Sequence, residues 1–260
     1  MSEDLIIERQ GAVATLVLNR PESHNAISIG MYTELPVLIS SLDDDPTVKV
    51  IVVRGAGEKS FASGADISEF KAQRSNAQSA RNYNERVAAA EHAIEALKKP
   101  TIAMIHGYCI GGGAGLALSC DIRFADTKAR FAITPSKLGL VYSLESTKRV
   151  VDLAGPSRAN WILTSGLQIP AERALALGLF DELSAPEDLE KYTYDFAETV
   201  ATRAQFSVRT GKAMVRRVVT GQVTDDEETT HMRNSSFDTE DYAEGVRAFL
   251  EKRPPQFLWS

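Results

Sequence analysis

Apolar residues along the chain follow two different periods. Three short runs, Ala12–Leu18 (AVATLVL), Val48–Val53 (VKVIVV) and Thr101–Ile105 (TIAMI), are nearly continuous and rich in β-branched residues, which is typical of buried strands. Between these runs, Ile29–Leu42 and a longer segment from about Ala77 to Leu97 carry apolar residues at three- and four-residue spacing, which predicts helices with one buried face. Strands that alternate with helices indicate an α/β fold.

The pattern changes near residue 145, beyond which strand signals fade. The apolar spacing there predicts consecutive helices over Glu145–Leu153, Ser157–Thr164, Ala171–Leu177, Leu189–Arg203, Ser207–Val219 and Glu240–Lys252. No linker rich in Pro, Gly or Ser separates the two halves. We therefore expect an all-helical region that packs on the α/β core or on a neighbouring subunit, and not an independent domain.

Composition narrows the function classes. The 260 residues are 43% hydrophobic with a net charge of −6, which suits a soluble protein and disfavours a nucleic-acid partner. No apolar run reaches the ~18 residues that a membrane span needs, and the acidic N-terminus does not resemble a signal peptide, so we expect a cytoplasmic protein. Cys109 and Cys120 lie in apolar surroundings and are expected to be buried thiols, and four scattered histidines predict no metal site.

Two glycine-containing loops each follow an apolar strand. The first is Phe61–Ile67 (FASGADI), and the second is Gly111–Gly113, which leads into an expected helix at Ala114–Leu118. Free N–H groups at a helix start attract negative charge. The segment GGGAGLAL lacks the Lys and Ser/Thr of a Walker loop and fits a dinucleotide fingerprint poorly. The loops therefore form an oxyanion hole from two backbone N–H groups, or their glycines only permit close packing.

Five stretches together resemble the enoyl-CoA hydratase/isomerase (crotonase) superfamily. They are FASGADI, GYCIGGGAGLALSCDI (Gly107–Ile122), LNRPESHNAIS (Leu18–Ser28), GLQIPAERALALGL (Gly166–Leu179) and FLEKRPPQF (Phe249–Phe257). The resemblance implies a crotonase-like spiral of β-β-α turns over residues 1–200 and a helical C-terminal trimerisation region over residues 201–260, in a homotrimer or homohexamer. It also implies an acyl-CoA thioester as substrate, with coenzyme A part of that substrate and no tightly bound cofactor. The N–H groups of Ala65 and Gly112 would form the oxyanion hole.

Two glutamates expected from the family's hydratases are missing. One would stand at Gly115, and the other falls on Pro135 in FAITPSKLG, or on Ser136 with a one-residue slip. Hydration needs an acid and a base, each worth about 10²–10⁴-fold in rate, so their loss predicts impaired two-glutamate hydration. Decarboxylation of a malonyl-type thioester needs no base to form the enolate, so this reaction fits the missing glutamates, and hydration or isomerisation is the alternative.

Local similarity to the methylmalonyl-CoA decarboxylase branch supports decarboxylation. The segment Phe131–Thr147 contains its Thr-Pro-x-x-Leu-Gly-x-x-Tyr pattern. This match would make Tyr142 an active-site residue that orients the substrate carboxylate, or Tyr142 is a core tyrosine whose hydroxyl has a hydrogen-bond partner. Two departures from the branch are Ala65, where it has a histidine, and Gly115, where it keeps a glutamate. Glu145 is the one nearby carboxylate that could act as acid or base, or it stabilises a helix N-terminus. Tyr142 and Glu145 would then support hydration or isomerisation.

Further residues are candidates for binding the thioester. The resemblance and the loop positions assign this role to His24, Ala26, Ala62, Ser63, Gly64, Asp66, Ile67, Gly111, Pro135, Phe249 and Lys252. Lys252 would contact a phosphate of coenzyme A and Phe249 would cover its arm, or both only belong to a solvated last helix. Asp66 is expected to fix its turn by local hydrogen bonds and His24 to shape the nucleotide loop. A non-catalytic acyl-CoA binder is the alternative from another class.

Overall fold

The computed structural model describes residues 3–69 and 76–258, and its centre is a six-stranded sheet. The strand order is β1 (Leu5–Gln10), β2 (Val13–Leu18), β3 (Val50–Gly55), β5 (Thr101–Ile105), β7 (Ile122–Asp126) and β10 (Glu182–Ser184). β1 and β2 form an antiparallel hairpin, and every other neighbouring pair is parallel. Parallel pairing requires crossover connections, which the helices provide.

A second, four-stranded sheet contains the shortest strands. Its order is β4 (Ser60–Ala62), β6 (Tyr108–Ile110), β8 (Arg130–Ala132) and β9 (Ile169–Pro170), and only β8 and β9 are antiparallel. After the β1–β2 hairpin, three turns of the chain each place one strand in the large sheet, one in the small sheet and then a helix. They are β3, β4 and α3, then β5, β6 and α4, then β7, β8 and α5. This arrangement is the expected β-β-α spiral.

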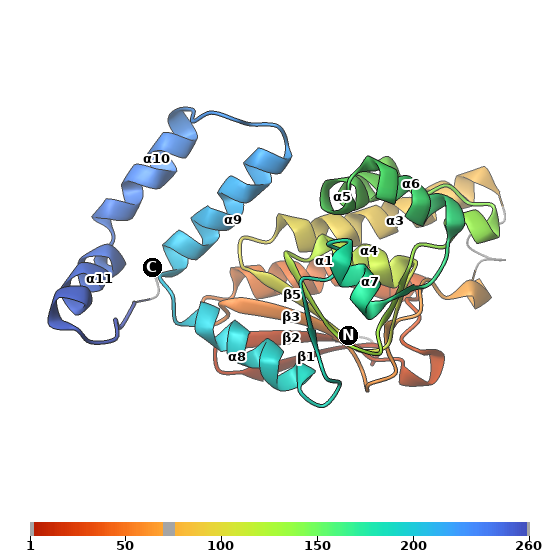
Figure 1. Ribbon diagram of the computed structural model, residues 1–260, viewed down its shortest axis with the longest axis horizontal. Coiled ribbons are helices and arrows are strands. Elements are labelled where there is room, and N and C mark those ends of the chain that lie inside the picture. Colours follow the sequence, from red (N-terminus) through yellow and green to blue (C-terminus); the bar gives the residue numbers. More distant parts are fainter. Residues whose placement is uncertain (1–2, 70–75, 259–260) are drawn as a thin grey trace.

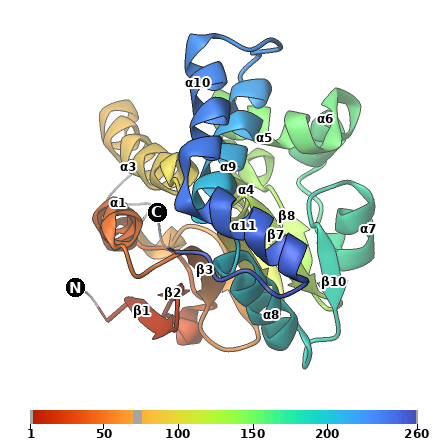
Figure 2. The same cartoon turned by 90° about the vertical axis from the view of Figure 1, so that its left-hand side faces the viewer.

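Helices connect the strands and follow them. They are α1 (Ile29–Asp44), α3 (Ala77–Ala96), α4 (Gly112–Ser119), α5 (Leu144–Ala154), α6 (Pro156–Ser165), α7 (Ala171–Ala176), α8 (Leu189–Ala201), α9 (Gln205–Val219), α10 (Glu227–Ser235) and α11 (Glu240–Glu251). In Figure 1, α9 and α10 extend away from the sheets, and α11 lies at one end of the long axis. Figure 2 shows the same three helices in front of the sheet.

The central strands are apolar on both faces because both faces are covered. In β3, Ile51 and Val53 join the core beneath α1, α3 and α4, whereas Val50 and Val52 pack with Leu189 of α8 on the other side. Successive side chains of a strand point to opposite faces. The continuous apolar runs in the sequence are therefore explained by a parallel sheet between two helical layers.

Strands also occur where the sequence predicts helices alone. The expectation of an all-helical chain beyond residue 145 is wrong, since β9 and β10 lie between α6 and α8. Both strands are too short, at two and three residues, to show an alternating pattern. After Ala201 the chain is helical, with α9, α10 and α11.

Both cysteines lie in the interior of the protein. Cys109 and Cys120 are free and buried, as the apolar surroundings predict. Among the described residues, no helix is both long and apolar enough to cross a bilayer.

Candidate active site

The two amides predicted to form an oxyanion hole lie side by side. Gly112 is the first residue of α4, and the amide nitrogen of Ala65 is 3.4 Å from the position that a β-carbon would take on Gly112. The first N–H groups of a helix have no partner within the helix. Gly112 and Ala65 are both half-buried, so their amides lie near the surface of the protein and not in its core.

Hydrogen bonds of the neighbouring residues fix the direction of the Ala65 amide. Ile27 donates to the carbonyl of Gly64 at 2.8 Å and accepts from the amide of Asp66 at 2.9 Å. Because N–H groups alternate in direction along an extended segment, the Ala65 amide points away from Ile27. Gly64 has φ +116°, which a residue with a side chain rarely adopts. Gly111 lies next to Gly64, with its β-carbon position 3.8 Å from the Gly64 α-carbon.

Arg20 joins the two loops that surround this amide pair. Its guanidinium donates to the carbonyl of Ala26 at 2.8 Å and to Asp66 Oδ2 at 2.9 Å. The other oxygen of Asp66 accepts from the amide and the hydroxyl of Ser68, so Asp66 fixes the turn as the sequence predicts. Hydrogen bonds from Ser68, opposed by burial, together with those from Arg20, hold the pKa of Asp66 below its usual value.

The remaining loop candidates lie around this pair. The Ser63 amide donates to the His24 carbonyl at 3.0 Å, and His24 packs edge-on against Tyr108. Ala62 and Ser63 lead into Gly64, and Ile67 is exposed. Pro135 begins a 3₁₀ turn that follows Thr134, whose hydroxyl is 3.6 Å from the β-carbon position of Gly111. The structure thus brings the candidates from residues 24 to 135 around one face.

Glu91 of α3 fills the space beside Gly115. Its Oε1 atom is 2.2 Å from the position that a β-carbon would take on Gly115, and the Glu91 side chain is buried. A β-carbon cannot approach a heavy atom that closely, so position 115 accepts no side chain while Glu91 is in place. A carboxylate from another helix therefore lies beside the empty α4 position.

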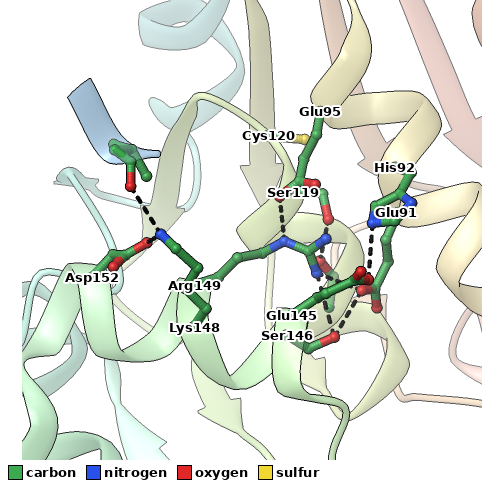
Figure 3. Close-up of polar contacts among 12 residues, drawn as sticks. Glu91, His92, Glu95, Ser119, Cys120, Glu145, Ser146, Lys148, Arg149 and Asp152 are labelled. Carbon is green, nitrogen blue, oxygen red and sulfur yellow. Dashed lines mark hydrogen bonds and ion pairs between the residues drawn. The ribbon is translucent and has the colours of Figure 1, made fainter. Parts of the chain in front are cut away.

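Glu91 is held by two groups from α5. Its Oε2 atom accepts from the Ser146 hydroxyl at 2.9 Å and from Arg149 Nη1 at 2.5 Å. Arg149 also forms an ion pair with Glu95, one turn further along α3 (Figure 3). Burial opposes the charge of Arg149, but hydrogen bonds and charges from Glu95 and Glu91 outweigh it and raise the Arg149 pKa. The cluster contains two carboxylates and one guanidinium.

Tyr142 points into the same region. Its hydroxyl is 3.6 Å from the β-carbon position of Gly115, and it is buried without a hydrogen-bond partner among the described residues. Burial, and then the charge of Glu91, raise the pKa of Tyr142. A buried hydroxyl without a partner is costly and calls for an explanation. A ligand group could provide the missing hydrogen bond.

Glu145 lies on the outer side of the same helix. Its carboxylate pairs with His92 Nε2 at 2.9 Å, and its side chain is 60% exposed (Figure 3). Ser143 caps α5, so Glu145 stands in the first turn, where a negative charge stabilises the helix. This position supports the structural alternative for Glu145, while its catalytic role stays a prediction.

Phe249 and Lys252 lie far from the amide pair within one chain. Phe249 is 82% exposed on α11, and Lys252 ends that helix with φ 54°. In Figure 1, α11 is well separated from α4. A contact between these two residues and a thioester bound at Gly112 would need the C-terminal region of another subunit.

Sequence reasoning missed six residues in or beside this site: Arg20, Tyr32, Glu91, Glu95, Ser146 and Arg149. The Tyr32 hydroxyl lies next to Gly112, and the other five make the contacts described above. Glu91 is a charged residue on the buried face of an amphipathic segment, and that mismatch is a signal that could have singled it out. No pattern in the sequence distinguishes Tyr32.

The fold is a spiral of β-β-α turns in which the amide nitrogen of Ala65 lies beside Gly112, the first residue of α4. The profile of the family described as enoyl-CoA hydratase/isomerase matches residues 8–259. The chain belongs to the enoyl-CoA hydratase/isomerase family. Among the described residues, no cluster of three or more His, Cys, Asp or Glu side chains could hold a metal.

Relatives and solved structures cover nearly the whole chain. The crotonyl-CoA hydratase of Syntrophomonas wolfei is 33% identical over 98% of both chains. The short-chain-enoyl-CoA hydratase of Clostridium acetobutylicum is 32% identical, over 96% of this chain and 95% of its own. The structure of an enoyl-CoA hydratase/isomerase family protein from Hyphomonas neptunium superposes with a TM-score of 0.96 at 38% identity, covering 99% of this chain and 98% of its own.

Proposed function

We propose that the protein binds an acyl-CoA thioester and stabilises its enolate through the amides of Ala65 and Gly112. The observation that carries this proposal is the closeness of these two amides, which come from separate loops. Charge that develops on the thioester oxygen would be met by two preorganised donors. Removal of one such donor typically costs about 2.7–4 kcal/mol of barrier.

The reaction that fits the site best is hydration or isomerisation of a neutral enoyl thioester. Glu91 and Glu95 outnumber Arg149 beside the Gly115 position, so the cluster carries a net negative charge. This charge disfavours an anionic acyl group such as malonyl, because like charges in a low-dielectric site repel each other. The hydratase names of the two relatives support the same choice.

Decarboxylation remains the second candidate because of one observation. The Tyr142 hydroxyl is buried and has no partner among the described residues, so it could donate to a substrate carboxylate. In the decarboxylase branch that the local pattern resembles, this tyrosine would have that role.

Binding of coenzyme A would use loops from more than one subunit. His24, Ala26 and Asp66 lie beside the amide pair, whereas Phe249 and Lys252 would come from a neighbouring chain. The surfaces of α9 and α11 support a homotrimer or homohexamer, since Val215, Val218, Phe249 and Leu250 are all more than 60% exposed. We place the activity in the cytoplasm, in keeping with two free thiols.

A panel of three thioesters tests the proposal. Crotonyl-CoA and a 3-enoyl-CoA would be followed by absorbance and mass, and methylmalonyl-CoA by CO₂ release. We expect turnover of an enoyl thioester and none of methylmalonyl-CoA. Release of CO₂ alone would establish the second candidate, and tight binding without any turnover would identify a non-catalytic acyl-CoA binder.

A further inference from the structure

The buried carboxylate of Glu91 occupies the space that a side chain at position 115 would otherwise fill. Gly115 is three residues after Gly112, on the same face of α4 and about 4.5 Å further along its axis. A thioester whose oxygen meets the Gly112 amide can therefore extend its acyl carbons along α4 toward Gly115. Oε1 of Glu91 occupies the space at that point.

The placement of Glu91 is not explained by stability alone. Its side chain is buried on α3, where an apolar residue would pack on the core without the cost of removing a charge from water. Replacement of a buried ion pair by apolar residues is often neutral or stabilising. The presence of a buried carboxylate at this position therefore calls for a functional account.

The contacts of Glu91 hold one carboxylate oxygen and leave the other directed at the Gly115 position. Ser146 and Arg149 both donate to Oε2, whereas Oε1 is the atom that lies beside Gly115. Arg149 divides its charge between Glu91 and Glu95, so Glu91 is not fully neutralised by its partner. A fixed carboxylate with one oxygen directed at the reacting carbons is the arrangement that a general base requires.

We propose that Glu91 is the catalytic acid and base of this enzyme, supplied by α3 in place of the glutamate that α4 lacks at Gly115. This inference rests on the proposed function. In hydration, Oε1 accepts a proton from water while the water oxygen bonds to the β-carbon, and the electrons of the double bond move to the thioester oxygen as an enolate. The protonated Glu91 then returns its proton to the α-carbon. Water is added across the double bond and the carboxylate is regenerated.

Ser146 and Arg149 are positioning residues in this scheme, because both donate to Glu91 and neither lies at the Gly115 position in the described contacts. In the same contacts Glu95 does not touch Glu91, and it lies outside the catalytic machinery. Glu95 offers a matched control for Glu91. It is on the same helix, one turn away, and it pairs with the same arginine, but its carboxylate is not the one beside Gly115.

Exchange of the α-protons of butyryl-CoA in D₂O tests the role without depending on the later steps of the reaction. Exchange needs only a base and a stabilised enolate, and mass spectrometry measures it. We expect the wild-type protein to catalyse exchange, Glu91→Gln to slow it by about 100-fold or more, and Glu95→Gln to stay within about 5-fold. Binding of butyryl-CoA should change less than about 3-fold in both variants, since neither residue holds the coenzyme.

A relocation variant covers the case in which Glu91→Gln does not fold. Glu91→Ala removes the atom that blocks position 115, so Glu91→Ala combined with Gly115→Glu has room for a carboxylate on α4. We expect the double variant to exchange at least 10-fold faster than Glu91→Ala alone, a gain that a purely structural ion pair would not produce.

Several results would overturn the role of Glu91. One is exchange in Glu91→Gln at the wild-type rate, and another is an equal loss of exchange rate in Glu91→Gln and Glu95→Gln. The others are no exchange in wild-type protein that binds butyryl-CoA, and no gain in exchange rate in the relocation variant. If wild-type protein hydrates crotonyl-CoA and Glu91→Gln does so equally well, the proposed function stands and Glu91 is excluded. If wild-type protein binds no CoA thioester, the proposed function fails and the role of Glu91 fails with it.

Discussion

The hydroxyl of Tyr32 lies 2.2 Å from the position that a β-carbon would occupy on Gly112. The next atom of that ring, Cζ, is 3.6 Å away, which is an ordinary contact. The φ angle of Gly112 is not among the positive values of the chain, so its backbone does not by itself require glycine. Glycine is needed there because of the Tyr32 hydroxyl.

This contact predicts that the effect of one substitution depends on the other. Gly112→Ala should displace Tyr32 or the start of α4, misplace the amide and lower kcat by about 10- to 100-fold, because a misplaced oxyanion donor loses much of its effect. Tyr32→Phe combined with Gly112→Ala should recover most of that loss. Steady-state kinetics of both single variants and the double variant would give the coupling, expected at about 0.5–3 kcal/mol. Additive effects would contradict the contact.

Tyr142→Phe should separate stability from activity. The hydroxyl has no partner among the described residues, so its removal relieves a buried polar group and should leave the free energy of unfolding unchanged or raise it by up to ~1 kcal/mol. Activity should fall if the hydroxyl meets the thioester substrate. Urea unfolding and kcat, measured on the same preparation, check both parts. A clear loss of stability with full activity would show that the hydroxyl has a structural partner.

Arg20→Ala should weaken thioester binding more than it slows chemistry. Without its guanidinium, the carbonyl of Ala26 and the carboxylate of Asp66 lose a common donor, and the two loops are no longer tied together. We expect KM to rise about 10-fold, equivalent to ~1.4 kcal/mol, with a smaller change in kcat. Arg9→Ala is the control, since Arg9 pairs with Asp45 on another part of the surface. An equal change in both variants would remove the link to binding.

Both thiols should be unreactive in the folded protein up to high pH. Burial is the largest cause that raises the pKa values of Cys109 and Cys120, the latter to about 12. An ordinary thiol with a pKa of about 8.5 would become reactive between pH 7 and pH 9. A colorimetric disulfide reagent should therefore label neither cysteine of the native protein over this range and both after unfolding in guanidinium. Rapid labelling at pH 8 would contradict the burial of the labelled residue.

The sequence predicts the longer helices and strands, because their apolar residues repeat along the whole element. The strand at Thr101–Ile105 is observed with the same bounds, and the helix expected from Ala77 to about Leu97 is observed as Ala77–Ala96. Long apolar runs and long amphipathic segments contain enough repeats to identify their type. The three-residue strands β4, β6 and β8 contain no full repeat, and their pairing is decided by contacts between distant parts of the chain.

The candidate site residues also differ in whether the sequence can predict them. Ala65 and Gly112 can be predicted because each belongs to a local motif, a loop after a strand or a helix start. Glu91 and Gly115 are on different helices, and only the packing of α3 against α4 brings them together. A glycine at position 115 can be seen in the sequence, whereas the carboxylate that lies beside it from another helix can be seen only in the three-dimensional arrangement.

The contact between Glu91 and Gly115 also restricts how this lineage can change. A single mutation to glutamate at position 115 would force two carboxylates into the same space, and any β-carbon there already meets Oε1 of Glu91. Loss of the acidic residue on α3 would have to come first. A carboxylate on α3 and one at position 115 of α4 therefore exclude each other, and natural variation at these two positions should be strongly epistatic.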